Sequence, residues 1–540
     1  ILIVHSGGDS RRLPAYSAYG KIFTPLPSPQ HHTVFDIILN TYASLPGHPE
    51  GHVIITSGDV LLNFSRERVY FADKGITGVG YPDDAEAASH HGVFVPQSQA
   101  YDRASRVLDF LQKPDRDILM KHHAIDYQQR VWVDTGILHL APDAVETMLR
   151  CKKLLAHALE EKRDINLYDH IPFAILGKKK IPDSDQLQKL KFHVSLLPYC
   201  GFFHIGRSKE FLYNLFTLTH AAAEYGFRSG IRSSGAADLK AKKVFVYNSI
   251  VPALPHPKAA PVLIENCVLA DSPSLEGDNI VTGVPEGIRT IHLQTGVCLT
   301  VLPLKNGSWT ALLYGIEDHF KSGVRTENNL FLNQPVEQWL QQRNLAPEIV
   351  WDKNKGDVWS ARLFPVCRSA QEAVSVVQSL QRKDASLAAW IQADRQSLQW
   401  ILRSVDHDQI ISQQKFVERS VMLSSLEHIL IADSELGSQQ LLDLCPDPSS
   451  LKNLAQRLFR MAATHPDILL QSRLYFLLHR VLNVTGRPLQ KEFKQMHNLT
   501  ADKSLDLSFS KIRNAVSTPL LLSNQRSEER RVGKECRSRW

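Results

Sequence analysis

The chain has 540 residues, 43% of them hydrophobic and 22% charged, which is the composition of an ordinary globular protein of roughly two to four domains. Its seven cysteines are scattered without a CxxC pair, and no apolar run is long enough to cross a membrane. The sequence therefore predicts a cytoplasmic protein with reduced thiols, no structural zinc, no signal peptide and no membrane partner. Half of the net charge of +6 lies in residues 526–540, so the nearly neutral body predicts no nucleic-acid partner.

Residues 1–232 alternate short apolar runs with helical stretches, which predicts an α/β domain built on a parallel sheet. The expected strands are at residues 1–6, 52–57, 76–81, 91–95, 132–140 and 191–198, and the clearest expected helices are at Thr33–Leu45 and Ala144–Glu160.

Beyond that domain the pattern changes twice. Residues 244–325 contain short β-runs with frequent Gly, Pro and Asn, which predicts a β-rich domain of stacked strands and is compatible with a partial β-helix. Residues 330–525 carry Leu, Ala and Gln at helical spacing and predict a mainly helical connector or support region. Residues 526–540 have no periodic apolar face and are expected to be a spurious or disordered tail.

The first expected strand leads into a loop with Gly7, Gly8, Arg11 and Arg12, and Lys21 follows it. Adjacent glycines let the backbone turn tightly and bring its N–H groups close to phosphate oxygens. Arginine can bind phosphate through two parallel hydrogen bonds, and lysine acts on it as a point charge. The spacing matches neither a Walker A loop nor a dinucleotide-binding glycine motif. Taken alone, Gly-Gly would indicate an ordinary turn, but the combination predicts a nucleotide phosphate site.

Gly58 and Asp59 come directly after the apolar run at 53–57. A carboxylate at the carboxyl edge of a parallel strand points into the ligand crevice of such a sheet. Asp59 is therefore expected to hold Mg²⁺ on a triphosphate, with Gly58 beside the nucleotide. An aspartate that merely caps the next segment is the alternative.

Four further polar residues stand next to expected strands: His91, Lys113, Asp134 and His204. A histidine followed by glycine can contact a base, ribose or sugar, and a strand-terminal aspartate can accept hydrogen bonds from sugar hydroxyls. Taken singly, each of the four is better explained as a loop or turn residue without a ligand.

In their order, these elements resemble the sugar nucleotidyltransferase superfamily. More closely, they are similar to the guanylyltransferase half of the bifunctional L-fucokinase/fucose-1-phosphate guanylyltransferases. The matching stretches are HSGGDSRRLPAYSAYGKIFTPLP (5–27), SGDV (57–60), HHGVF (90–94), LQKP (111–114), DTGI (134–137), LYDHIPFAI (167–175), FFHIGRSKE (202–210), IEN (264–266) and NIVTGVPE (279–286).

The resemblance implies a Rossmann-like nucleotidyltransferase sheet and the reaction of GTP with fucose 1-phosphate to give GDP-fucose and pyrophosphate. It implies catalytic roles for Arg12, Lys21 and Lys113. It implies that Asp134 and His204 contact the sugar phosphate and that Asp59 binds Mg²⁺. The implied nucleotide-binding residues are Gly7, Gly8, Arg11, Gly58 and His91. His204 stands where many superfamily members have a second metal-binding aspartate, so a second metal is not expected there.

The family also implies a C-terminal sugar kinase domain on the same polypeptide and a segment before the first strand. Neither is found in this sequence, so we expect a fragment that does not phosphorylate fucose. Two alternatives stay open: a non-catalytic support module of a fucokinase, and a nucleotidyltransferase for another sugar 1-phosphate, because the residues themselves do not specify the base or the sugar.

Overall fold

The computed structural model describes residues 1–5, 10–28, 33–43, 45, 50–89, 91–159, 169–216, 225–230, 233–235, 243–255, 260–320, 329–352, 356–424, 448–464, 471, 474–479 and 481–482. Gly7, Gly8 and the expected tail at 526–540 lie outside these residues. The chain divides into a larger unit, Ile1–Ile231 with Gly235–Ile410, and a smaller unit, Arg232–Ser234 with Ile411–Trp540. Within the described ranges, no helix has the length and apolar character needed to cross a membrane.

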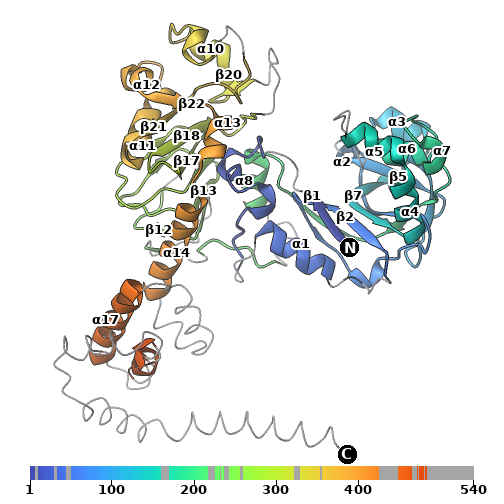
Figure 1. The fold of residues 1–540 in the computed structure, drawn as a ribbon, viewed down its shortest axis with the longest axis horizontal. Coiled ribbons are helices and arrows are strands. Elements are labelled where there is room, and N and C mark those ends of the chain that lie inside the picture. The colour runs from blue at the N-terminus through green and yellow to red at the C-terminus, as the bar shows by residue number, and fades with distance from the viewer. Residues whose placement is uncertain are drawn as a thin grey trace, which may run out of the picture. The chain divides into compact units, whose positions relative to one another are not determined.

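The first sheet of the larger unit has seven strands (Figure 1). Their order is β1 (Leu2–His5), β2 (Val53–Ser57), β7 (Arg130–Leu140), β4 (Ile76–Asp84), β8 (Phe192–Leu196), β6 (Ser105–Gln112) and β5 (Gly92–Pro96). The expected parallel sheet is in fact mixed: β1–β2 and β4–β8 are parallel, but β7 is antiparallel to β2, β4 and β5. Alternating apolar residues identify a strand but not the direction of its neighbours, which explains the difference.

Strand β5 pairs with both β6 and β7, so β7, β4, β8, β6 and β5 form a closed ring. Aromatic rings pack against one another in this part of the core: Phe94 lies 5.0 Å from Phe110 and 5.9 Å from Phe192, centroid to centroid. A Cβ atom on Gly78 would come within 2.5 Å of the Phe94 ring. The glycine is therefore required for the ring of Phe94 to pack this closely against β4.

Helices α3 to α7 gather at one end of this region (Figure 1). The helices are α1 (Val34–Ala43), α2 (Ala85–Ala88), α3 (Arg116–Lys121), α4 (Pro142–Arg150), α5 (Lys152–Leu159), α6 (His170–Ile175), α7 (Ser184–Leu187) and α8 (Ser208–Phe216). Thr33 and Asp36 exchange backbone and side-chain hydrogen bonds at the start of α1, which is why that helix begins there. The expected helix at Ala144–Glu160 is two helices, because the chain turns at Cys151.

The second sheet begins with four parallel strands, β11 (Val244–Tyr247), β13 (Val262–Glu265), β15 (Asn279–Thr282) and β17 (Val297–Pro303). Paired residues on consecutive strands lie 17 or 18 residues apart in the chain. Equivalent residues therefore stack: Thr282 and Thr300 join their hydroxyls at 2.9 Å, and Asn248 donates to Asn266 at 3.3 Å. Both asparagines have positive φ angles, which Asn tolerates better than most residues.

The second sheet continues beyond the boundary expected at residue 325. Antiparallel strands β18 (Trp309–Gly315), β21 (Phe364–Cys367) and β22 (Asp394–Gln396) extend it. Helices α10 (Val336–Gln341), α11 (Ala370–Gln378), α12 (Ala388–Gln392) and α13 (Leu398–Ser404) alternate with short strands there, including the hairpin of β19 (Leu330–Phe331) and β20 (Gln334–Pro335). The strands in this stretch are two to four residues long. Such strands are too short to show an alternation of apolar and polar residues, so only the helices gave a recognisable sequence pattern.

The smaller unit contains most of α14 (His407–Ser424) and all of α17 (Pro448–Thr464). Apolar residues at helical spacing on α17, including Leu451, Leu454 and Leu458, are buried against Leu474 and Leu477. The buried face of α17 thus repeats at helical spacing, as in an amphipathic helix.

Candidate functional site

A short antiparallel pair outside the main sheet brings two distant segments together. Strand β3 (Val60–Asn63) pairs with β9 (Gly201–His204), with Val60 opposite His204, and the backbone N–H of Ile205 donates to Asp59 O at 2.8 Å. Asp59 itself lies in the tight turn between β2 and β3. The pairing therefore places the Asp59 and His204 side chains next to each other.

The turn before Asp59 requires a glycine. The backbone N–H of Gly58 donates to His5 O at 2.8 Å, and a Cβ atom at position 58 would lie 2.6 Å from the same oxygen. Gly58 was predicted to be next to the nucleotide. In the structure its nearest neighbours are the backbone of β1 and the side chain of Ile22.

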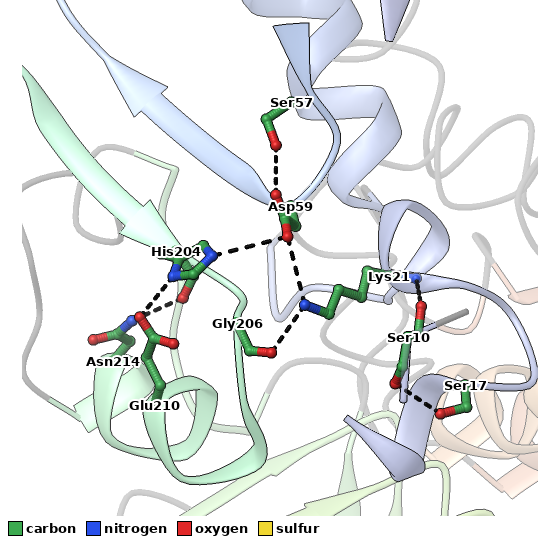
Figure 2. Close-up of polar contacts among 9 residues, drawn as sticks. All are labelled: Ser10, Ser17, Lys21, Ser57, Asp59, His204, Gly206, Glu210 and Asn214. Atoms are coloured by element: carbon green, nitrogen blue, oxygen red, sulfur yellow. Dashed lines mark hydrogen bonds and ion pairs between the residues drawn. The ribbon is translucent and has the colours of Figure 1, made fainter. Parts of the chain in front are cut away.

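The Asp59 carboxylate has contacts from three sides (Figure 2). Ser57 Oγ donates to Oδ1 at 2.5 Å, while Lys21 Nζ and His204 Nε2 lie 3.5 and 3.8 Å from Oδ2. Burial by itself would raise the pKa of Asp59, but the contacts with His204, Lys21 and Ser57 outweigh it and hold this pKa far below its ordinary value. Asp59 is therefore a fixed negative charge at the end of β2.

Lys21 is buried, with a relative exposure of 2%. Its Nζ donates to Gly206 O at 2.9 Å, and its backbone N–H donates to Ser10 Oγ at 2.8 Å (Figure 2). Burial lowers the pKa of Lys21, which the neighbouring Asp59 partly offsets. The lysine thus ties the segment after the glycine loop to Asp59 and to the turn after β9.

His204 stands between two carboxylates (Figure 2). Glu210 Oε1 lies 2.8 Å from Nδ1, and Asp59 Oδ2 lies near Nε2 on the other side of the ring. Burial would lower the pKa of His204, but hydrogen bonds and charge from Asp59 and Glu210 raise it to about 9. Because each ring nitrogen faces an acceptor, the geometry favours a doubly protonated, cationic imidazole.

A cavity of about 770 Å³ opens next to these residues. Its lining comes from the ends of β1, β2 and β6, the starts of β3 and β5, the middle of β7, the segment of β9 and α8, and two further positions. The residues are His5, Ser57, Asp59 and Val60; His91, Gly92, Gln112, Lys113, Asp134, Thr135 and Gly136; Phe202, His204, Arg207, Lys209, Glu210 and Tyr213; Arg12; and Glu317. The cavity thus combines several cationic side chains with carboxylates and an aromatic ring, as a site for a phosphorylated polar ligand requires. Asp134 was expected at the end of a strand but lies inside β7, because that strand continues to Leu140.

One side of the cavity has groups suited to hydroxyls. Asp134 on β7 is 9% exposed and accepts from the Gly136 N–H at 2.9 Å, and burial raises the pKa of Asp134 to about 7. Gln112, at the end of β6, has a buried Oε1 without a hydrogen-bond partner in the described part of the chain. Lys113 follows with a φ angle of 48°. These side chains leave hydrogen-bonding capacity for a ligand.

The two adjacent arginines have different surroundings. Arg12 lines the cavity, whereas the guanidinium of Arg11 stacks on Trp359, with its carbon 4.1 Å from the ring centroid. Arg12 also lies close enough to Lys21 and His319 to help lower the pKa of each. Clustered cations of this kind favour binding of an anion.

The cavity brings together most of the residues singled out from the sequence: Arg12, Asp59, His91, Lys113, Asp134 and His204. The other three described residues do not line the cavity. Lys21 contacts Asp59, Gly58 allows the tight turn before Asp59, and Arg11 stacks on Trp359 next to the second sheet. The roles predicted for all of these residues stay predictions, and Gly7 and Gly8 lie outside the described residues.

Sequence reasoning singled out Arg207 together with His204, but it missed several other residues of the lining: His5, Gln112, Lys209, Glu210, Tyr213 and Glu317. Glu210 lies in the first turn of α8, where an acidic residue is usual and carries no functional signal. Glu317 reaches the cavity from a turn that is 108 residues away from its partner Lys209. No local spacing could have revealed that contact.

Comparison with known proteins adds independent information. The family model described as the fucose pyrophosphorylase domain matches residues 1–182 and 184–369. An L-fucokinase/L-fucose-1-P guanylyltransferase of Bacteroides fragilis is 25% identical, over 96% of this chain and 54% of that protein. A bifunctional fucokinase/GDP-fucose pyrophosphorylase of Arabidopsis thaliana is 25% identical, over 75% and 42%. A fucose-1-phosphate guanylyltransferase of Mus musculus is 25% identical, over 69% and 73%. The chain thus spans about half the length of the two bifunctional relatives, at 54% and 42%.

Proposed function

The chain belongs to the fucose pyrophosphorylase domain family, and from this premise we propose that it transfers a guanylyl group from GTP to L-fucose 1-phosphate. The observation that carries the proposal is the cavity itself, whose lining includes the cations Arg12 and Lys113 and the carboxyl groups of Asp59 and Asp134. The cations suit phosphates, and the carboxyl groups suit a metal ion and sugar hydroxyls.

In the proposed reaction, a phosphate oxygen of fucose 1-phosphate attacks the α-phosphorus of GTP. A new P–O bond forms there while the bond from the α-phosphorus to the oxygen bridging it to the β-phosphorus breaks, which gives GDP-fucose and pyrophosphate. The protein contributes position and charge rather than a covalent intermediate. Arg12 and Lys113 would neutralise phosphate charge, with Asp134 on the sugar hydroxyls, and Lys21 would hold Asp59 in place.

Mg²⁺ is the metal that we propose for this site, with Asp59 as its protein ligand. The residues fit such an ion, because Asp59 is ionised and the contacts of its Oδ2 are long, at 3.5 and 3.8 Å. Across the described ranges, no group of three or more His, Cys, Asp or Glu side chains could hold a metal on its own. The remaining ligands would be nucleotide oxygens and water, as is usual for Mg²⁺, which when bound offsets phosphate charge.

We extend the proposal to the fold of each sheet and to the cellular context of the chain. The parallel register of 17 or 18 residues supports a short β-helix in the second sheet, and the βα order of the first region supports a Rossmann-like nucleotidyltransferase sheet. We also propose a cytoplasmic location and a sugar kinase on the same polypeptide that supplies fucose 1-phosphate. The names of the two bifunctional relatives support the kinase partner.

A substrate panel tests the function directly. GTP, ATP, UTP and CTP are each incubated with fucose 1-phosphate and several other sugar 1-phosphates, and mass spectrometry identifies any nucleotide sugar. We expect GDP-fucose with Mg²⁺ present, and none from the Asp59→Ala variant. A preference for another base or sugar would change the substrates, and GTP binding without any product would favour the non-catalytic support module.

A further inference from the structure

Arg11 and Arg12 are neighbours in the chain, but their guanidinium groups lie in different places. Arg12 lines the cavity. The guanidinium of Arg11 instead stacks on the ring of Trp359. A phosphate role suits Arg12, whereas the placement of Arg11 calls for a different explanation.

Trp359 is a rigid platform for Arg11. Its ring is only 8% exposed, and it lies in the segment that leads into β21 of the second sheet. A planar guanidinium stacks on an indole face better than an ammonium does, and the attraction grows when the pair is shielded from water. Arginine is therefore the residue type that this contact requires.

Backbone contacts fix the same short segment on both sides. Phe320 donates its backbone N–H to Arg11 O at 3.1 Å, and Ser208, the first residue of α8, donates to Arg12 O at 3.1 Å. Behind them, Tyr16 joins its hydroxyl to that of Tyr247 on β11 at 2.9 Å. The segment that carries Arg12 is thus held between α8 and the second sheet.

We propose that Arg11 is a positioning residue: by stacking on Trp359 it anchors the segment of Arg11 and Arg12 to the second sheet and sets the place of Arg12 in the cavity. The inference rests on the proposed function in that Arg12 is taken to bind nucleotide phosphate. The second sheet would then influence nucleotide binding indirectly, because Trp359 is not one of the residues that line the cavity. Arg11 and Trp359 both fall within the residues matched by the family model.

The test is a double-mutant cycle with nucleotide affinity as the readout. Calorimetry measures binding of the nucleotide that the wild-type chain binds, in Arg11→Ala, Arg11→Lys, Trp359→Leu and the double variant Arg11→Ala/Trp359→Leu. We expect Arg11→Ala and Trp359→Leu each to weaken binding about ten-fold. The double variant should be no worse than Arg11→Ala alone, because Arg11→Ala already removes the stack on Trp359. Trp359→Met, which has no aromatic face, replaces the leucine variant if the latter does not fold.

The chain offers a matched control in Arg395, whose guanidinium lies 4.2 Å from the ring centroid of Trp390, away from the cavity. Arg395→Ala removes the same kind of contact, so a general loss of stability would affect it equally. Equal nucleotide affinity in Arg11→Ala and Arg395→Ala, or additive losses in the cycle, would overturn the inference.

Kinetics separate this inference from the proposed function. GDP-fucose formation by the wild type tests the proposed guanylyl transfer, whereas the variants test whether Arg11 positions Arg12. We expect Arg11→Ala to raise KM for GTP about ten-fold and to leave KM for fucose 1-phosphate within about two-fold. If the wild type binds a nucleotide but makes no GDP-fucose, the function fails while the cycle still decides the role of Arg11. A wild type that binds no nucleotide overturns both.

Discussion

Alternating charges explain why the largely buried carboxylate of Asp59 stays ionised. Lys21, Asp59, His204 and Glu210 follow one another as cation, anion, cation and anion, with neighbours 2.8 to 3.8 Å apart. Burial would raise the pKa of Glu210, but His204 outweighs it and lowers that pKa, so each anion is held ionised by its neighbour. Removing one member would leave its partner as a buried, uncompensated charge.

Asp134 shows the opposite behaviour and allows a prediction about pH. Burial raises its pKa from 3.8 to about 7, and the Gly136 N–H offsets only part of this. The folded protein therefore binds this proton more tightly than the unfolded chain does. The resulting stabilisation is complete below pH 3.8 and is lost as the pH rises through 7.

Asp134→Asn cannot ionise, so it should avoid that loss. Relative to the wild type, its free energy of unfolding should be higher at pH 8 than at pH 5 by about 1–4 kcal/mol. Thermal unfolding at the two pH values measures the difference. Asp185→Asn, at an exposed position on α7, serves as the control. A difference for Asp134→Asn that does not change with pH would show that Asp134 is already ionised at pH 5.

At the scale of elements, the turn between β2 and β3 determines where Asp59 lies. In a Gly58→Ala variant the new Cβ would lie 2.6 Å from His5 O and 3.1 Å from Ile22 Cδ1, so the turn must move. We expect a loss of about 1–3 kcal/mol in stability and of about 100-fold in pyrophosphate release, because a displacement of about 1 Å at a reacting centre costs that much.

Gly287→Ala separates the two effects of that substitution. Gly287 has a φ angle of 92° and open space around its Cβ position, so alanine there strains the backbone without touching the cavity. It should reduce stability by about 1–2 kcal/mol and leave pyrophosphate release unchanged. If both variants keep full activity, the turn does not control the position of Asp59.

Local sequence patterns predicted the elements better than their partners. Apolar runs located β1, β2, β4, β5, β7 and β8, and the glycine and charged motifs located Arg12, Asp59, Lys113 and Asp134 in one cavity. The antiparallel direction of β7 could not be predicted, because a strand has the same apolar period in either direction. The Arg11–Trp359 stack escaped prediction because it depends on the packing of distant segments.

At the scale of the whole larger unit, the region of the second sheet contributes Glu317 to the lining of the cavity. Glu317, in the turn after β18, lies 2.5 Å from Lys209 of α8, and Tyr213 of the same helix donates to Asp278 at 2.8 Å. Both partners of the ion pair are nearly half exposed, at 46% and 43%. Such pairs contribute less than about 1 kcal/mol to stability, so their effect should appear in ligand binding rather than in unfolding.

Exchanging the charges of Lys209 and Glu317 tests in solution whether this ion pair affects ligand binding. Lys209→Glu places a second carboxylate beside Glu317 in a cavity that we propose binds a triphosphate. The added negative charge should lower kcat/KM for GTP about ten-fold or more. The unfolding temperature should stay nearly unchanged, because the pair is exposed. Adding Glu317→Lys restores the pair with its direction reversed and should recover most of the loss. Steady-state pyrophosphate release measures both variants at low and high salt, because screening should shrink the effect. If the double variant is as impaired as the two single losses combined, the residues act independently. The ion pair between Lys209 and Glu317 would then not be what links α8 to the second-sheet region at the cavity.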